Sequence, residues 1–148
     1  MITIRELDHV VLRVIELPKM LDFYCRVLGC VVERRQEELG LVQLRAGRSL
    51  LDMLTIGGTL GGAGGSPPTD AGRNMDHFCF RVEPFDAAAI RAFLAANGVT
   101  AGDVVSRYGA EGEGPSLYLS DPEGNTVELK GPPFGHDVDL ARPPAAVQ

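Results

Sequence analysis

The sequence lacks the features of a secreted, membrane-spanning or nucleic-acid-binding protein. Its three cysteines are odd in number and form no CxxC pair, so neither a disulfide framework nor a structural zinc knuckle is indicated. No run of eighteen apolar residues and no signal-peptide pattern occurs, so we expect a cytoplasmic protein without a membrane partner. The net charge is −6, and the only two lysines, Lys19 and Lys130, form no basic cluster, which argues against a nucleic-acid partner. A small molecule is the expected partner.

The most informative feature that is present is an internal repeat. Residues 7–14 (LDHVVLRV) recur as residues 75–82 (MDHFCFRV), with identity at four of eight positions. A repeat of this size indicates two copies of one structural module. It also places a histidine at the same point of both copies.

Each copy has the pattern of one strand, one helix and three further strands. In the first copy, the alternating strand 9–14 is followed by a helix that begins at Pro18 and ends at Gly29, and then by strand candidates at 30–36, 41–46 and 49–56. The second copy gives a strand at 76–82, a helix from Asp86 to Asn97-Gly98, and strand candidates at 104–107, 116–120 and 125–130. We therefore predict an α+β fold of two βαβββ modules.

The predicted modules occupy residues 1–56 and 75–131. Between them, residues 57–74 are rich in glycine and proline, a composition typical of a linker, a lid over a pocket, or both. After Gly131 the sequence has no periodicity, so residues 132–148 are expected to form an irregular C-terminal arm.

Strand alternation predicts four ionisable residues on the inward faces of two curled mixed sheets. His9 and His77 occupy equivalent positions of the first strand in each copy, and Asp52 stands where Glu128 stands in the other copy. Ionisable groups directed into a pocket need neutralising partners. Two imidazoles with one or two carboxylates suit zinc, nickel, iron, manganese or cobalt. We therefore predict that the sheets enclose a metal pocket lined by His9, Asp52, His77 and Glu128.

Four segments carry a resemblance to the vicinal oxygen chelate superfamily: residues 7–10, 23–29, 75–80 and 117–129. This superfamily groups glyoxalase I, bleomycin-resistance and fosfomycin-resistance proteins, methylmalonyl-CoA epimerases and extradiol dioxygenases. The last segment is the most specific, because its Asp-Pro-x-Gly-Asn element is a tight turn that delivers the strand bearing Glu128. By this resemblance, His9, His77 and Glu128 fall on the family's metal ligands.

The positions at which this chain departs from the family patterns indicate which subgroup of the superfamily it resembles most. Glyoxalase I-like members commonly have Glu where this chain has Asp52, which either binds the metal or stands back from it. Extradiol dioxygenases have a catalytic histidine where this chain offers residues 109–111. The segment 112–118 is similar to one in fosfomycin-resistance proteins, in which the residues matching Ser116 and Tyr118 line the ligand site, although Val11 stands where some of those enzymes have Thr. Residues 107–112 are most similar to a glyoxalase-domain-containing subgroup.

The resemblance implies a metal-dependent enzyme acting on a small oxygen-chelating substrate, with lyase or isomerase chemistry of the glyoxalase or epimerase type. The alternatives are a fosfomycin-type epoxide-opening or thiol-transfer enzyme, an extradiol-type dioxygenase, and a metal-free ligand-sequestering resistance protein. Asp52 and Glu128 are the candidate catalytic carboxylates, and Ser116 and Tyr118 are candidate substrate-binding residues. Arg81 either clamps an anionic substrate or forms a salt bridge. We expect a homodimer.

Overall fold

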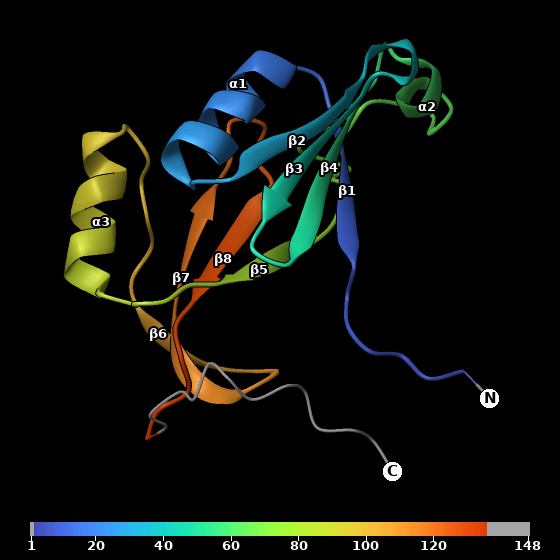
Figure 1. The fold of residues 1–148 in the computed structure, drawn as a ribbon. Coiled ribbons are helices and arrows are strands. Elements are labelled where there is room, and N and C mark those ends of the chain that lie inside the picture. Colours follow the sequence, from blue (N-terminus) through green and yellow to red (C-terminus); the bar gives the residue numbers. More distant parts are fainter. Residues whose placement is uncertain (1, 136–148) are drawn as a thin grey trace. The chain divides into compact units, whose positions relative to one another are not determined.

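The structure, a computed structural model, describes residues 2–135, which divide into two compact units (Figure 1). Unit 1 comprises residues up to His77 together with Ser120–Thr126, and unit 2 comprises Phe78–Leu119 and the residues from Val127 onward. The two sheets are both four-stranded and open, and each βαβββ module builds one of them. The predicted α+β fold of two βαβββ modules is confirmed.

The first sheet has the strand order β1-β4-β3-β2. Its strands are β1 (His9–Val14), β2 (Val31–Gln36), β3 (Leu41–Ala46) and β4 (Ser49–Thr55). β1 runs parallel to β4, whereas β2 and β3, and β3 and β4, are antiparallel pairs. Two short helices, the 3-10 turn η2 (Glu37–Leu39) and α2 (Thr59–Gly62), lie in the connections that follow β2 and β4.

The second sheet has the equivalent order, β5-β8-β7-β6. Its strands are β5 (His77–Arg81), β6 (Val105–Gly109), β7 (Gly112–Ser120) and β8 (Thr126–Lys130). The helix of this module is α3 (Ala87–Ala96). The Asp86 side chain caps its first turn by accepting a hydrogen bond from the Ala89 N–H at 3.0 Å, and Gly98, with φ +74°, follows its end. None of the helices in residues 2–135 has the length and apolar character needed to cross a membrane.

The first helix differs from its sequence-based prediction. It consists of α1 (Leu17–Leu21) followed by a π-helical turn, η1 (Asp22–Val27), in which the Leu28 N–H donates to the Phe23 carbonyl five residues earlier. The buried residues Met20, Phe23, Tyr24 and Val27 keep the spacing of an ordinary α-helix. Hydrophobic spacing therefore predicts a helix here but does not reveal the wider turn.

The Asp-Pro-x-Gly-Asn turn between β7 and β8 is part of unit 1. The Asp121 carboxylate accepts hydrogen bonds from the Tyr24 hydroxyl, the Asn125 side chain and two backbone N–H groups of the turn. The Glu123 carboxylate accepts from the backbone N–H groups of Ile15 and Glu16, just before α1 begins. The turn that leads into β8 therefore also holds the start of the first helix.

Replacement of Tyr24 by phenylalanine should lower the free energy of unfolding by about 1–2 kcal/mol, because the buried Asp121 carboxylate loses one of its donors. Burial raises the pKa of Tyr24 far above its usual value, so the hydroxyl remains a donor at neutral pH. Urea denaturation measures the change. Tyr108→Phe is the matched control, because that side chain is 82 % exposed. Equal stabilities of the two variants would contradict the assigned role of Tyr24.

Candidate metal and substrate site

Asp52 is a buried carboxylate on β4. In the sheet register it lies between Val11 on β1 and Gln43 on β3, and it is 6 % exposed. The Gln43 side-chain amide donates to Oδ2 at 3.0 Å, whereas Oδ1 is buried and has no hydrogen-bond partner among residues 2–135. A buried carboxylate oxygen without a donor is costly and rare. Oδ1 is therefore suited to a cation, a water molecule or a proton.

Glu128 is the corresponding buried carboxylate on β8, also 6 % exposed. The Ser116 hydroxyl, on neighbouring β7, donates to Glu128 Oε1 at 2.5 Å. Ser116 has no exposed surface, and its position orients the carboxylate of Glu128. The sequence pattern had indicated Ser116 only as a substrate-binding residue, and that role stays a prediction.

The two repeat histidines begin equivalent strands and have equivalent partners. His9 Nδ1 pairs with Asp8 Oδ1 at 2.8 Å, and His77 Nδ1 pairs with Asp76 Oδ1 at 2.5 Å. A carboxylate that holds Nδ1 fixes the ring and favours Nε2 as the nitrogen that ligates a metal. The role of these aspartates was missed in the sequence, although an aspartate precedes the histidine in both copies of the repeat.

The candidate ligands are distributed as one histidine and one carboxylate on each sheet. His9 and Asp52 lie on the paired strands β1 and β4; the hydrogen bond to Asp8 raises the pKa of His9, and the Asp52 charge acts in the same direction. His77 and Glu128 lie on the paired strands β5 and β8. Among residues 2–135, no three His, Cys, Asp or Glu side chains gather in a group that could hold a metal ion. The four-residue ligand set therefore stays a prediction.

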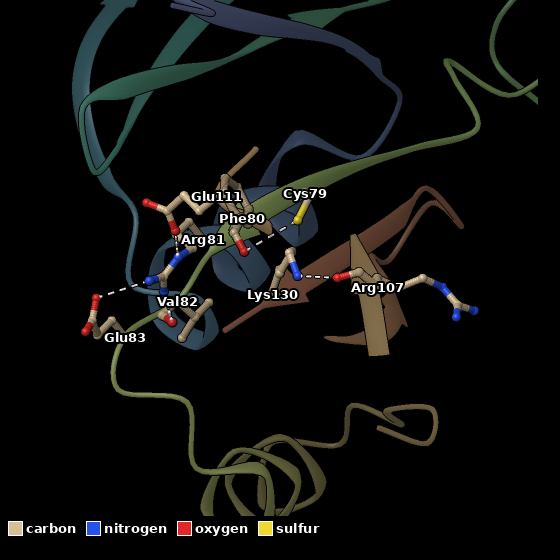
Figure 2. Close-up of polar contacts among 8 residues, drawn as sticks. All are labelled: Cys79, Phe80, Arg81, Val82, Glu83, Arg107, Glu111 and Lys130. Carbon is tan, nitrogen blue, oxygen red and sulfur yellow. Dashed lines mark hydrogen bonds and ion pairs between the residues drawn. The ribbon is translucent and has the colours of Figure 1, made fainter. Parts of the chain in front are cut away.

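Arg81 forms ion pairs within the second unit (Figure 2). Its Nε donates to Glu111 Oε2 at 2.6 Å, and one terminal nitrogen lies 3.4 Å from Glu83 Oε2. The other terminal nitrogen donates to the Val82 carbonyl at 2.8 Å. These contacts correspond to the salt-bridge alternative for Arg81, and the substrate clamp stays a prediction.

Arg13, the equivalent residue of the first copy, fastens the glycine-rich segment. Its guanidinium donates to the carbonyls of Gly61, Gly65 and Ser66. A Cβ at Gly64 would lie 2.6 Å from Arg13 Nε, so the glycine allows the segment to pass close to the guanidinium as it stands. The backbone of residues 61–66 is thus held onto β1 by one side chain.

Tyr118 lies on β7, with the Arg107 guanidinium carbon 6.0 Å from its ring centroid. Burial raises the pKa of Tyr118. A hydrogen bond with Arg107 acts against this shift, and the charge of Glu128 and a hydrogen bond with it act in the same direction as burial. Tyr118 therefore keeps its proton at neutral pH and stands within reach of a candidate metal ligand. Its role as a substrate-binding residue stays a prediction.

Comparison with solved structures shows the same architecture in other proteins. An integron cassette protein from the mobile metagenome of V. cholerae is 26 % identical, with a TM-score of 0.72 over 88 % of this chain and 98 % of that chain. Lactoylglutathione lyase from Agrobacterium tumefaciens is 21 % identical, with a TM-score of 0.60 over 85 % of this chain and 92 % of that chain. The fosfomycin resistance protein FosX from Mesorhizobium loti is 17 % identical, with a TM-score of 0.62 over 89 % and 96 %. The last two likenesses are evidence for the fold alone.

No curated protein sequence matches the chain. A family model does match, and it spans residues 6–129, which include both strands that begin with a histidine and the strand that carries Glu128. The resemblance seen in the sequence is therefore confirmed, and the chain belongs to the Glyoxalase/Bleomycin resistance protein/Dioxygenase superfamily.

Proposed function

We propose that the chain is a metal-dependent enzyme that acts on a small oxygen-chelating substrate, with lyase or isomerase chemistry of the glyoxalase or epimerase type. The observation that carries this proposal is the equivalent placement of one histidine and one buried carboxylate on paired strands of both sheets. The superfamily includes glyoxalase enzymes, which supports an enzymatic role.

The imidazole and carboxylate donors of these residues fit a divalent cation, and the buried, unpaired Asp52 Oδ1 would accept a metal-bound water molecule or a proton. In the proposed site, His9, His77 and Glu128 are the lasting ligands, and zinc, nickel, iron, manganese and cobalt are the candidate ions. When bound, the cation would stabilise negative charge that develops on two oxygens of the substrate. Asp8 and Asp76 would orient the two imidazoles.

Asp52 is proposed to move the proton. Gln43 holds its Oδ2, so Oδ1 is the oxygen left to accept a proton from the substrate and to return it at another atom. The Asp52 side chain is one methylene shorter than that of the Glu usual in glyoxalase I-like sites. It is therefore better suited to a base than to a permanent ligand.

An activity screen tests the proposed reaction. The metal-loaded chain should convert 2-oxoaldehyde hemithioacetals or epimerise a related small substrate, and a chelator should remove the activity. Turnover of epoxides with water or thiols would instead support a fosfomycin-type enzyme, and ring opening of catechols would support a dioxygenase. A chain that takes up no metal yet retains small ligands would contradict the proposal in favour of a sequestering protein.

We also propose that the chain forms a homodimer, because the sheets are open and exposed edge strands require covering. Light scattering should give about twice the 15.8 kDa mass of one chain. A monomer at micromolar concentration would contradict this. Mixing His9→Ala chains with His77→Ala chains then tests for shared sites, because activity returns on mixing only if one site takes its histidines from two chains.

A further inference from the structure

Lys130 is the last residue of β8 and one of only two lysines in the chain. The residue is 7 % exposed, so most of its side chain is removed from solvent. The ammonium donates a hydrogen bond to the Arg107 carbonyl at 2.6 Å (Figure 2). Among residues 2–135 it makes no other hydrogen bond and no ion pair. An ammonium carries three N–H donors and a full charge. Burial of a charge without a counter-ion is expensive, so an anion is the partner that this group lacks.

The hairpin of β6 and β7 lies against this side chain. A Cβ at Gly109 would lie 2.6 Å from Lys130 Cε, whereas a Cβ at Gly114 would lie 2.5 Å from the Pro132 carbonyl oxygen and 3.1 Å from Lys130 Nζ. All three atoms nearest to the Gly109 position belong to Lys130. Glycine at position 109 therefore leaves the room that the end of the lysine side chain occupies.

Lys130 also has a defined relation to the proposed metal ligand. Glu128 and Lys130 are two residues apart on one strand, so their side chains share a face of β8, with Cα atoms about 7 Å apart. No ion pair joins them among the described residues. The carboxylate and the ammonium thus lie on the same face of β8.

We propose that Lys130 binds the anionic group of the substrate. This inference rests on the proposed function and narrows it. The substrate class is a small molecule with two chelating oxygens and, on the order of 7 Å away, a carboxylate or phosphoryl group. A lysine suits this role as a compact charge that accepts either kind of anion.

Calorimetric titration of inorganic phosphate and of malonate into the full chain, made metal-free on a chelating resin, tests the inference. One or both anions should bind, and the preferred one identifies the anionic group, whereas uncharged glycerol should not bind. Lys130→Met should weaken anion binding about tenfold or more, because a charge-assisted contact is lost. Lys19→Met is the control, because that side chain is 68 % exposed, and it should leave binding unchanged.

Two further measurements separate binding from a structural role. Lys130→Met should not lower the unfolding temperature, because it removes an uncompensated buried charge. Gly109→Ala keeps the charge but displaces the lysine side chain, so it should also weaken anion binding. The inference is overturned if the wild-type chain binds neither anion, or if both variants bind them as the wild type does. Metal uptake on the same preparations reports separately on the proposed function.

Discussion

Replacement of Glu128 by alanine is expected to remove metal binding and turnover together. Glu128 is a buried carboxylate that Ser116 holds in position, and it falls on the most specific family motif in the chain. Loss of a residue that only orients a ligand typically costs about 10–100-fold in metal affinity, so loss of the ligand itself should exceed that range. His77→Ala should give the same result.

Two control variants should show a smaller loss of metal affinity and no loss at all. Ser116→Ala should reduce metal affinity by about tenfold, because it removes one donor to Glu128 and leaves the carboxylate itself in place. Glu38→Ala, an exposed carboxylate on η2, should change nothing. If Glu128→Ala retained wild-type metal content and a wild-type unfolding profile, Glu128 would not be a ligand.

Replacement of Asp52 by asparagine is expected to have the opposite signature, with most of the metal retained and turnover lost. The amide has nearly the same shape as the carboxylate but cannot accept the substrate proton, so the rate should fall by about 10²–10⁴-fold. Metal content and rate must be measured on the same preparation. An Asp52→Asn chain that is metal-free, or one that is fully active, would exclude the proposed division of roles.

A variant of the neighbouring residue Gln43 tests whether the position of the Asp52 carboxylate affects the rate. Gln43 donates to Asp52 Oδ2, so Gln43→Leu removes the group that holds the carboxylate while leaving the proton-accepting oxygen in the chain. We expect this variant to be slower than the wild type and faster than Asp52→Asn. The order of the three rates distinguishes a base that is held by a neighbour from a carboxylate that only fills space.

Much of the fold could be predicted from the sequence, because strand alternation and the repeat are local signals. β1 and β3 have the predicted bounds. Leu12 and Val14 on one face of β1 are fully buried, whereas His9 and Val11 on the other face are exposed. β7 begins at Gly112, four residues before the predicted start. Residues 112–115 contain two glycines and a proline, which are uncommon in strands, so the sequence did not predict a strand here. In the structure these residues pair with β6 throughout.

The site was less predictable, because its supporting contacts join residues far apart in sequence. The hydrogen bond from Ser116 to Glu128 and the three carbonyls held by Arg13 have no local sequence signal. The two Asp-His pairs, in contrast, could have been predicted from the sequence, because both copies of the repeat contain an aspartate directly before the histidine. The burial of Lys130 could not be predicted either. Strand alternation places Lys130 on the same face of β8 as Glu128, but it does not show which residues cover that face.

Metal content of the purified wild-type chain, compared with that of His77→Ala after identical exposure to zinc, nickel, iron, manganese and cobalt, tests metal dependence most directly. The wild-type chain should retain a stoichiometric amount of at least one of these ions after dialysis, and the variant should retain none. A folded wild-type chain that retains no ion, or a variant that retains as much as the wild type, would contradict the proposed metal-dependent enzyme.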